Sequence, residues 1–333
     1  MIIAVDAMGG DNAPLQIVKG VYEAALELKD VEIALIGDEG RINECFKEIE
    51  ATKPDNIKIV HTDVYVTMED DPMVVMKEKN NSSIALGLKA LKEGSVDAFV
   101  SAGSTGAIHA ASTLIVRKIK GVRRSAIASV LPFGNGLLML DSGANPTVTA
   151  ELLSQWAVIG SAYMRKVYGI ENPRVGLLNN GTEEHKGTPL AQEAYALLKA
   201  RTDINFIGNV ESRELPNGPC DVLVTDGFTG NITVKLIEGM GKLVFARLRK
   251  MFTVNLKTKL SYLFMKKELK KLKKDFDPSE YGGAVLLGLA KPVVKAHGSA
   301  KSKEIKNTVY QAVEYASSGI IDEVSKELVA EAK

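Results

Sequence analysis

Short apolar runs rich in β-branched residues alternate along this chain with longer segments that carry apolar residues at helical spacing. The run IIAV precedes a helical pattern over 14–28, VEIALIG precedes one over 41–49, and VDAFV precedes one over 106–116. RVGLL, INFIG and CDVLVT are further strand candidates, and 125–140 reads as two strands joined by a turn. This alternation is typical of a largely parallel sheet covered by helices on both faces, so we expect a three-layer α/β/α fold.

A polar, glycine-rich sequence recurs where an apolar run gives way to a helical pattern. Five junctions share this composition: AVDAMGGDNAP, FVSAGSTGA, LMLDSGANPT, LLNNGTEEHKGTP and LVTDGFTGN. The carboxyl ends of parallel strands lie at one edge of a sheet, where open α/β sheets bind ligands, so we expect the five junctions to share one site. The alternative for any single junction is a helix cap, with Asp11 or Asn12 ahead of Pro14 and Asn145 ahead of Pro146.

The nucleotide-binding and hydrolase motifs that such junctions suggest are missing from the sequence. A dinucleotide-binding loop needs G-x-G-x-x-G after the first strand, and the nearest match, Gly239-Met-Gly241, lies in a helical pattern typical of close helix packing. GTEEHKGT lacks the spacing of a P-loop, and SAGSTG misplaces the serine of a G-x-S-x-G nucleophile elbow. These absences disfavour a nicotinamide-dependent enzyme, a P-loop nucleotidase and a serine hydrolase.

Charge and cysteine content exclude several other classes of protein. Forty-two basic residues against 41 acidic ones leave a net charge of +1, which gives no overall attraction to nucleic acid. Cys45 and Cys220 lack the spacing of metal ligands, so we expect two core thiols and neither a metal site nor a disulfide. The first residues lack the pattern of a signal peptide, and the longest uncharged apolar stretch is shorter than the roughly 20 residues of a spanning helix, which favours the cytoplasm.

Backbone amides and hydroxyls at the glycine-rich junctions suit a small anion such as phosphate, because helix N-termini and turns of successive amides bind negative charge. Lys186, Lys235 and Lys295 are candidate charge partners for such an anion. His297 follows a β-rich run and precedes a glycine at another predicted strand end, which makes it a candidate catalytic residue. From the residues alone, a purely structural role for His297 remains the alternative.

A lysine-rich segment, VNLKTKLSYLFMKKELKKLKKDF over 254–276, differs from the rest of the chain. Its eight lysines between 257 and 274 face a single acidic residue, Glu268, and its leucines recur at helical spacing. Basic amphipathic helices are typical of membrane-surface elements and of docking sites for acidic partners. The alternative is a helical pair that packs against a second subunit. The candidate contact residues are Leu256, Leu260, Leu263, Phe264, Lys266, Lys267 and Lys270.

Seven segments occur in a characteristic order: VDAMGGD, SAGSTGA, DSGAN, NNGTEEHKG, DGFTGN followed by Lys235, YGGAVLLG and VKAHGSA. Together, across nearly the whole chain, they resemble the bacterial acyl-carrier-protein:phosphate acyltransferases of phospholipid synthesis. The chain departs from the common family pattern at Ser104, Lys77 and Asn81, which weakens any role for these three positions, and at His109, which we interpret as structural.

The resemblance implies that inorganic phosphate attacks the thioester of a long-chain fatty acyl group on acyl carrier protein, reversibly giving acyl phosphate and the carrier thiol. It also implies a fold like that of isocitrate and isopropylmalate dehydrogenases, a homodimer without a nicotinamide or other cofactor, and delivery of the product to a membrane glycerol-phosphate acyltransferase. We expect one α/β domain over 1–333, with 228–280 as a helical protrusion that contacts the dimer partner, the carrier or the membrane surface.

For this reaction a protein must position phosphate and stabilise the tetrahedral oxyanion. We assign phosphate to the amides and hydroxyls of 101–106, and we assign the oxyanion or a proton transfer to His297, with the three candidate lysines as charge partners. Asp6 is expected to brace neighbouring loops beside a close-approach turn. The candidate substrate- and phosphate-binding residues are Asp6, Gly9, Gly10, Ser101, Gly103, Ser104, Thr105, Gly106, Asp141, Asn145, Asn180, Gly181, Glu183, Asp226, Gly227, Thr229, Gly230 and Asn231.

Three rival functions remain open. A short-chain phosphotransacetylase would use coenzyme A in place of acyl carrier protein. A nicotinamide-dependent hydroxyacid dehydrogenase on the same fold would need a cofactor pocket. A non-enzymatic scaffold for lipid synthesis would explain the lysine-rich segment but would leave the glycine-rich junctions without a role.

Overall fold

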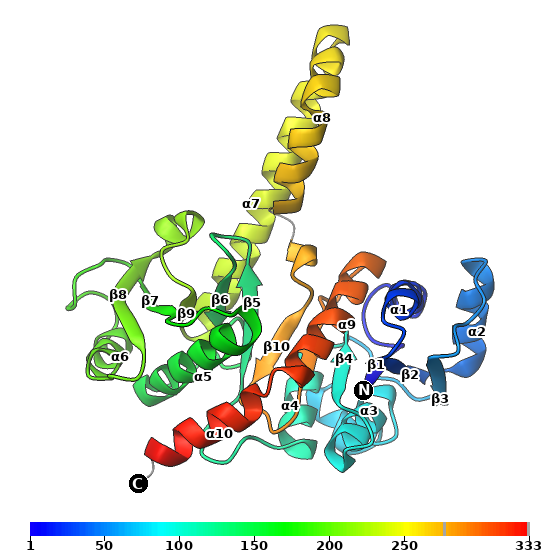
Figure 1. Cartoon of the computed structure of the whole chain (residues 1–333), viewed down its shortest axis with the longest axis horizontal. Helices are drawn as coiled ribbons and strands as arrows, with labels where there is room; N and C mark the ends of the chain where they lie inside the picture. Colours follow the sequence, from blue (N-terminus) through cyan, green and yellow to red (C-terminus); the bar gives the residue numbers. More distant parts are fainter. Residues whose placement is uncertain (276–277, 332–333) are drawn as a thin grey trace.

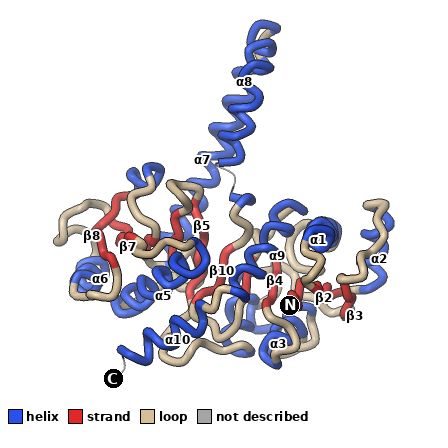
Figure 2. Tube along the Cα trace, in the orientation of Figure 1, coloured by secondary structure: helices blue, strands red, loops and turns tan. Residues whose placement is uncertain are grey.

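The computed structural model describes residues 1–275 and 278–331, so residues 276, 277, 332 and 333 of the predicted domain and protrusion lie outside the described residues. A single sheet runs through the described molecule, with helices on both of its faces (Figures 1 and 2). Its strand order is β3-β2-β1-β4-β11-β10-β5-β6-β9-β7-β8. The strands are β1 (Ile2–Asp6), β2 (Glu32–Gly37), β3 (Ile57–His61), β4 (Ala98–Ser101), β5 (Ala126–Leu131), β6 (Leu137–Leu140), β7 (Arg174–Asn179), β8 (Asn205–Glu211), β9 (Val222–Val224), β10 (Ala284–Leu287) and β11 (Val293–Lys295).

Helices follow most of these strands, as the alternation in the sequence predicts. The α-helices are α1 (Leu15–Glu27), α2 (Glu39–Glu48), α3 (Ser83–Glu93), α4 (Thr105–Ile115), α5 (Ala150–Tyr168), α6 (Pro189–Lys199), α7 (Gly227–Thr253), α8 (Leu256–Asp275), α9 (Ser302–Ser317) and α10 (Ile320–Glu331). Three short 3₁₀ segments are described as well: η1 (Pro72–Met76), η2 (Ser212–Asn217) and η3 (Pro278–Glu280). The three-layer, largely parallel architecture predicted from the sequence is therefore confirmed.

The sheet consists of two parallel groups of strands that run in opposite directions. Strands β3, β2, β1, β4 and β11 are parallel to one another, as are β6, β9, β7 and β8. Between the groups, β10 is antiparallel to both β11 and β5, and β5 is antiparallel to β6. The prediction that all five junctions lie at one edge is therefore wrong, because the β5–β6 hairpin reverses the direction of every strand that joins the sheet beyond it.

The hydrophobic core lies between the sheet and the helices on each face. On one face α5 buries Trp156 and Tyr163 completely, and Trp156 Nε1 donates to the carbonyl oxygen of Arg124 at 3.0 Å. On the other face α3 buries Ile84, Leu88 and further apolar residues. Burial of this extent stabilises the fold by about 1.5–3 kcal/mol for each large apolar side chain. Cys45 and Cys220 are buried and free, as predicted.

Two predicted helix caps are wrong. Asn12 does not cap α1, which begins at Leu15 without a side-chain cap; its Nδ2 instead donates to the carbonyl oxygens of Ser299 and Ala300, at 3.0 and 3.2 Å. Asn145 lies five residues before α5 begins and is itself buried. The side-chain amides of Asn12 and Asn145 both donate to backbone carbonyl oxygens far away in the sequence. Such partners cannot be recognised from the local sequence.

Helices α7 and α8 form a hairpin that projects away from the sheet (Figure 1). A Cβ atom at Gly239 or Gly241 on α7 would meet nothing within 4 Å, so the predicted close packing of these glycines does not occur within this chain. The distal hairpin exposes large apolar side chains, with Leu256 and Phe264 exposed by 74% and 84%. Within the described residues, no helix combines the length and the apolar character that crossing a bilayer requires.

Candidate functional site

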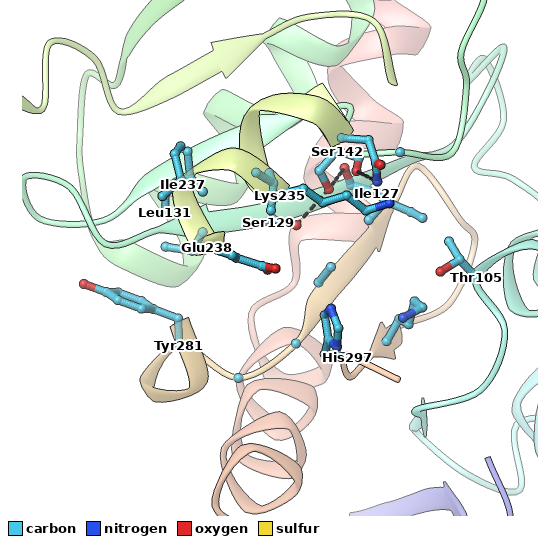
Figure 3. Close-up of a pocket in the computed structure, with 18 of the residues that line it drawn as sticks. Thr105, Ile127, Ser129, Leu131, Ser142, Lys235, Ile237, Glu238, Tyr281 and His297 are labelled. Carbon is cyan, nitrogen blue, oxygen red and sulfur yellow. Dashed lines mark hydrogen bonds between the residues drawn. The ribbon is translucent and has the colours of Figure 1, made fainter. Parts of the chain in front are cut away.

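A pocket of about 250 Å³ lies beside the strands that join the two halves of the sheet (Figure 3). Four regions that are distant in sequence line it: the start of α4, strand β5 with the turn that follows β6, the first turns of α7, and the segments around β10 and β11. The pocket therefore combines junctions from both strand groups. They meet over the middle of the sheet and not at one edge.

The first junction braces the loop that precedes α4. Asp6 is buried, and its Oδ2 accepts a hydrogen bond of 2.6 Å from the hydroxyl of Ser101. The Ser101 oxygen in turn accepts from the amide of Gly103 at 3.0 Å. Burial raises the pKa of Asp6, whereas hydrogen bonds from Ser101 and the amide of Met8 oppose that rise. Asp6 thus acts as the predicted brace, and the hydroxyl of Ser101 and the amide of Gly103 are occupied by protein partners.

The glycines of the first junction allow this close contact between loops. A Cβ atom at Gly9 would lie 2.8 Å from the nitrogen of Gly103, which no ordinary packing tolerates. Gly10 has a φ of +98°, a conformation that favours glycine. The next amide, that of Asp11, donates to the carbonyl oxygen of Gly298 at 2.7 Å. One turn therefore holds both the loop before α4 and the loop that carries His297.

The start of α4 faces the pocket. Ser104 precedes the helix and makes no capping hydrogen bond with its side chain. Thr105 lines the pocket, and its side chain points into it (Figure 3), whereas Gly106 packs against Pro72. Because the first amides of a helix have no partner within the helix, an uncapped N-terminus beside a pocket can bind an anion.

Lys295 and His297 line the pocket at and just after the end of β11. Lys295 ends β11, its Nζ donates to the carbonyl oxygen of Ala296 at 2.9 Å, and its burial lowers its pKa. The amide of His297 donates to Glu304 Oε1 at 2.9 Å. The amide of Ser299 donates to Nδ1 of His297 at 3.2 Å, so the neutral ring carries its proton on Nε2. His297 can therefore offer an N–H donor to a bound group.

The carboxylate of Asp141 shapes the opposite wall. Its Oδ1 accepts from the amides of Ile127, Gly143 and Ala144, at 3.0 to 3.1 Å. Its Oδ2 accepts from the amide and the side chain of Asn145, at 2.6 and 2.8 Å. Asp141 is fully buried, so five donors hold it as the centre of a turn. Asp141 and Asn145 therefore position Gly143, which lines the pocket, and do not line the pocket themselves.

The first turns of α7 add polar side chains to this wall. Asp226 caps the helix by accepting from the amide of Thr229 at 2.9 Å and from its hydroxyl at 2.7 Å. Asn231 Nδ2 donates to the carbonyl oxygen of Ser142 at 3.2 Å, and Lys235 lies one turn further along the pocket.

Two glycines bring α7 close to the turn after β6. A Cβ atom at Gly227 would lie 2.8 Å from the backbone of Asn145, and one at Gly230 would overlap the carbonyl group of Asp141. Gly227 and Gly230 therefore allow α7 to lie close against the turn after β6. The helix presents Asn231 and Lys235 to the pocket.

The junction after β7 lies outside the pocket. Its backbone is held locally: Asn209 Nδ2 donates to the carbonyl oxygen of Glu183 at 2.9 Å, and Asn179 Nδ2 donates to that of Lys186 at 3.2 Å. The side chains of Glu183 and Lys186 are exposed. Four candidate residues therefore lie outside the pocket that Lys235 and Lys295 line: Asn180, Gly181, Glu183 and Lys186.

Several residues of the pocket were not among those singled out in the sequence. Ser129 shares a hydrogen bond of 2.8 Å with Ser142, and Glu304 holds the amide of His297. Glu238 follows Lys235 by one helical turn, a spacing that could have identified it. His109 packs as a structural residue, with Nε2 3.1 Å from the hydroxyl of Ser125 and a pKa lowered by burial.

The pocket has a polar end and an apolar end (Figure 3). Thr105 lies at the polar end, whereas Leu131, Ile237 and Tyr281 lie at the other end, and the carboxylate of Glu238 extends from that side toward His297. The side chain of His297 points into the space between the two ends. This arrangement can hold a molecule that carries an anionic group and a hydrocarbon group side by side.

The candidate contact residues of the lysine-rich segment lie on α8, in the projecting hairpin (Figure 1). All seven side chains are exposed: Leu256, Leu260, Leu263, Phe264, Lys266, Lys267 and Lys270. Between α7 and α8 the hairpin also has a groove of about 700 Å³, whose lining includes Phe252, Tyr262, Lys266 and Lys270. Basic and aromatic side chains thus share one surface at a distance from the pocket.

Comparison with known proteins gives matches over nearly the whole chain. The family model described as "Fatty acid synthesis protein" matches residues 1–323. Phosphate acyltransferases from Streptococcus pyogenes serotype M5 (strain Manfredo) and serotype M1 are each 45% identical to this chain over 332 residues, covering 99% of it and 98% of the relative.

Solved structures show the same fold at low identity. A phosphotransacetylase from Streptococcus pyogenes matches with a TM-score of 0.62 at 18% identity, covering 95% of this chain and 94% of that one. The EutD phosphotransacetylase from Staphylococcus aureus gives 0.61 at 18% identity with the same coverage. A putative 4-hydroxythreonine-4-phosphate dehydrogenase from Salmonella typhimurium gives 0.51 at 13% identity, covering 94% and 98%. The dehydrogenase-like fold that the family resemblance implies is thereby confirmed.

Proposed function

Because the chain belongs to the family of fatty acid synthesis proteins, we propose that it transfers a long-chain fatty acyl group from acyl carrier protein to inorganic phosphate. Acyl transfer to phosphate is the activity named for relatives that are 45% identical to it. The chain is an acyltransferase of fatty acid and phospholipid synthesis, and its proposed product is an acyl phosphate, formed reversibly. The observation that carries the proposal is the pocket with one polar end and one apolar end.

The polar end supports a site for phosphate. The uncapped start of α4, the hydroxyl of Thr105 and the side chains of Lys235 and Lys295 surround the same space. Positive charge and amide dipoles attract the phosphate oxygens and hold one of them against the thioester carbon. The apolar end, with Leu131 and Ile237, takes the first carbons of the acyl chain.

The reaction needs no covalent intermediate on the protein. A phosphate oxygen attacks the carbonyl carbon, the carbon–sulfur bond breaks when the tetrahedral intermediate collapses, and the carrier leaves as a thiol with the proton that phosphate gives up. The Nε2–H group of His297 stabilises the oxyanion, and Asn231 orients the turn that faces it. Removal of one such donor costs on the order of 10²-fold in rate.

The hairpin supports the remaining elements of the proposal. Exposed Leu256 and Phe264, with the exposed lysines of α8, suit a peripheral contact with an anionic membrane surface from the cytoplasmic side. The same basic charge suits acidic acyl carrier protein. Four large apolar side chains along α7 are exposed and suit a homodimer contact: Phe228, Ile232, Leu236 and Met240. Delivery of the product to a membrane glycerol-phosphate acyltransferase follows from such a location, whereas nucleic acid has no role in it.

The deciding experiment measures phosphate-dependent release of thiol from long-chain acyl carrier protein, beside the matching acyl coenzyme A and acetyl coenzyme A. We expect the carrier substrate to react fastest and Nε2 of His297 to be required, so that His297→Ala lowers the turnover number without loss of folded protein. Preference for acetyl coenzyme A would favour a phosphotransacetylase. Absence of thiol release with every donor would contradict the proposal.

A further inference from the structure

Glu238 places a carboxylate in a pocket that is otherwise suited to an anion. It lies on α7 one turn after Lys235, and its side chain extends from the helix into the space that His297 also faces (Figure 3). The pocket is also lined by two lysines, Lys235 and Lys295, and by the hydrogen-bonding ring of His297. A carboxylate in that position repels any fully deprotonated anion, because like charges at short distance oppose one another.

The carboxylate of Glu238 is not held by a hydrogen bond or an ion pair within the part of the chain that the structure describes. Its charge acts on nearby Lys295. The other acidic residue of the pocket, Glu304, is occupied with the amide of His297. The side chain of Glu238 is only partly exposed, so solvent does not fully take the place of a partner. Its carboxylate oxygens are therefore available to accept a hydrogen bond from a molecule bound in the pocket.

The chemistry of phosphate supplies a donor for this acceptor. An ionised carboxylate only accepts hydrogen bonds, and near neutral pH hydrogen phosphate still carries one P–O–H group. Such an O–H···O⁻ contact is short and strong. Sulfate has the same shape and charge but carries no proton at this pH, so it can offer Glu238 only repulsion.

We propose, resting on the proposed function of this pocket, that Glu238 accepts the hydrogen of hydrogen phosphate and makes the site select phosphate over proton-free tetrahedral anions. Lys235, Lys295 and the start of α4 attract the oxygens of any such anion. Glu238 recognises the P–O–H hydrogen, which distinguishes hydrogen phosphate from sulfate. It is therefore a specificity-determining residue for the acceptor substrate.

The test compares the wild-type chain with Glu238→Gln, whose amide has the same shape but can donate to an unprotonated oxygen. Binding of phosphate, sulfate and monofluorophosphate is measured by calorimetry without any acyl donor, so the result does not depend on acyl transfer. We expect wild-type protein to bind phosphate at least tenfold more tightly than the other two anions. In Glu238→Gln this ratio falls by on the order of tenfold, mainly because sulfate and monofluorophosphate bind more tightly.

Two further variants keep the test decisive. Glu268→Gln on exposed α8 is the matched control and leaves the ratio unchanged. Glu238→Asp keeps a carboxylate acceptor, so we expect it to retain the preference for phosphate. This variant tests the assignment if Glu238→Gln folds poorly. An unchanged ratio in Glu238→Gln, a weaker phosphate affinity without any gain for sulfate, or no phosphate binding by the wild type would each overturn the assignment. Thiol release measured separately reports on the proposed function itself.

Discussion

The hydroxyl of Ser101 donates a 2.6 Å hydrogen bond to the buried carboxylate of Asp6, 95 residues earlier in the chain. This contact joins the end of β1, where the first loop begins, to the end of β4. The same first loop reaches the segment around His297 through the amide of Asp11, which donates to Gly298. The acidic, glycine-rich start of the chain is therefore a support for two walls of the pocket, and its carboxylate faces protein donors rather than an anion.

Replacement of Asp6 by alanine should lower both stability and activity. The change leaves the hydroxyl of Ser101 and the amide of Met8 buried without their acceptor, which costs about 1–3 kcal/mol for each group left unsatisfied. Urea unfolding measures the loss, and a double-mutant cycle with Ser101→Ala isolates the pair. If Asp6→Ala and Ser101→Ala have strictly additive effects, the two residues do not act as a brace.

Lys295 should set an upper limit to the active pH range. Burial lowers the pKa of Lys295, so the ammonium is lost at a lower pH than in an ordinary lysine, and phosphate loses a charge partner there. We expect kcat/KM for phosphate to fall as pH rises through that range. Lys295→Arg keeps its charge and should move the fall to higher pH. Identical profiles for the two proteins would remove Lys295 from phosphate binding.

Lys235 and Lys186 should behave differently when each is changed to alanine. Lys235 lines the pocket, whereas Lys186 lies in the loop after β7, outside it. We expect Lys235→Ala to lower kcat/KM for phosphate by on the order of 10²-fold and Lys186→Ala to have little effect. Steady-state kinetics with varied phosphate measures both. Equal losses would show that Lys186 reaches a site that a second chain completes.

Much of the architecture follows from patterns that act locally. Helical spacing and β-branched runs predict the helices and strands because each element must bury one face, and the glycine-rich junctions predict close loop contacts such as that of Gly9 with Gly103. The relative direction of the two strand groups could not be predicted in this way. It depends on whether the strands of 125–140 pair with each other, and the distant strand β10 then inserts beside β5.

The candidate site could also be predicted only in part from the sequence. Lys235, Lys295 and His297 meet in one pocket because each follows a strand or junction that the sequence marks. Glu238 and Tyr281 were missed because an acidic residue on a helix and a tyrosine before two glycines are common in any globular protein. Lys186 was included because its junction resembles the others, although its strand lies on the far side of β9.

The apolar end of the pocket should set the preferred acyl chain length. Ile237 on α7 faces the same space as Leu131 and Tyr281, so a larger side chain there shortens the space for the acyl group. We expect Ile237→Trp to shift the optimum of kcat/KM toward shorter chains, with a loss of roughly fourfold for each methylene that no longer fits. A series of acyl carrier protein thioesters of increasing chain length measures the profile. A uniform loss at every length would place the acyl chain elsewhere.

Charge reversal on α8 should weaken membrane association. Lys266, Lys267, Lys270 and Lys271 lie on the exposed hairpin, and each basic residue near an anionic bilayer contributes about 1 kcal/mol. Changing all four to glutamate should abolish sedimentation with anionic liposomes at low salt, and the wild type should dissociate as salt increases. The matched control reverses Lys47 and Lys92, which lie on helices beside the sheet, and should bind like the wild type. Undiminished binding by the fourfold variant would show that α8 serves the carrier protein or a second subunit and not the membrane.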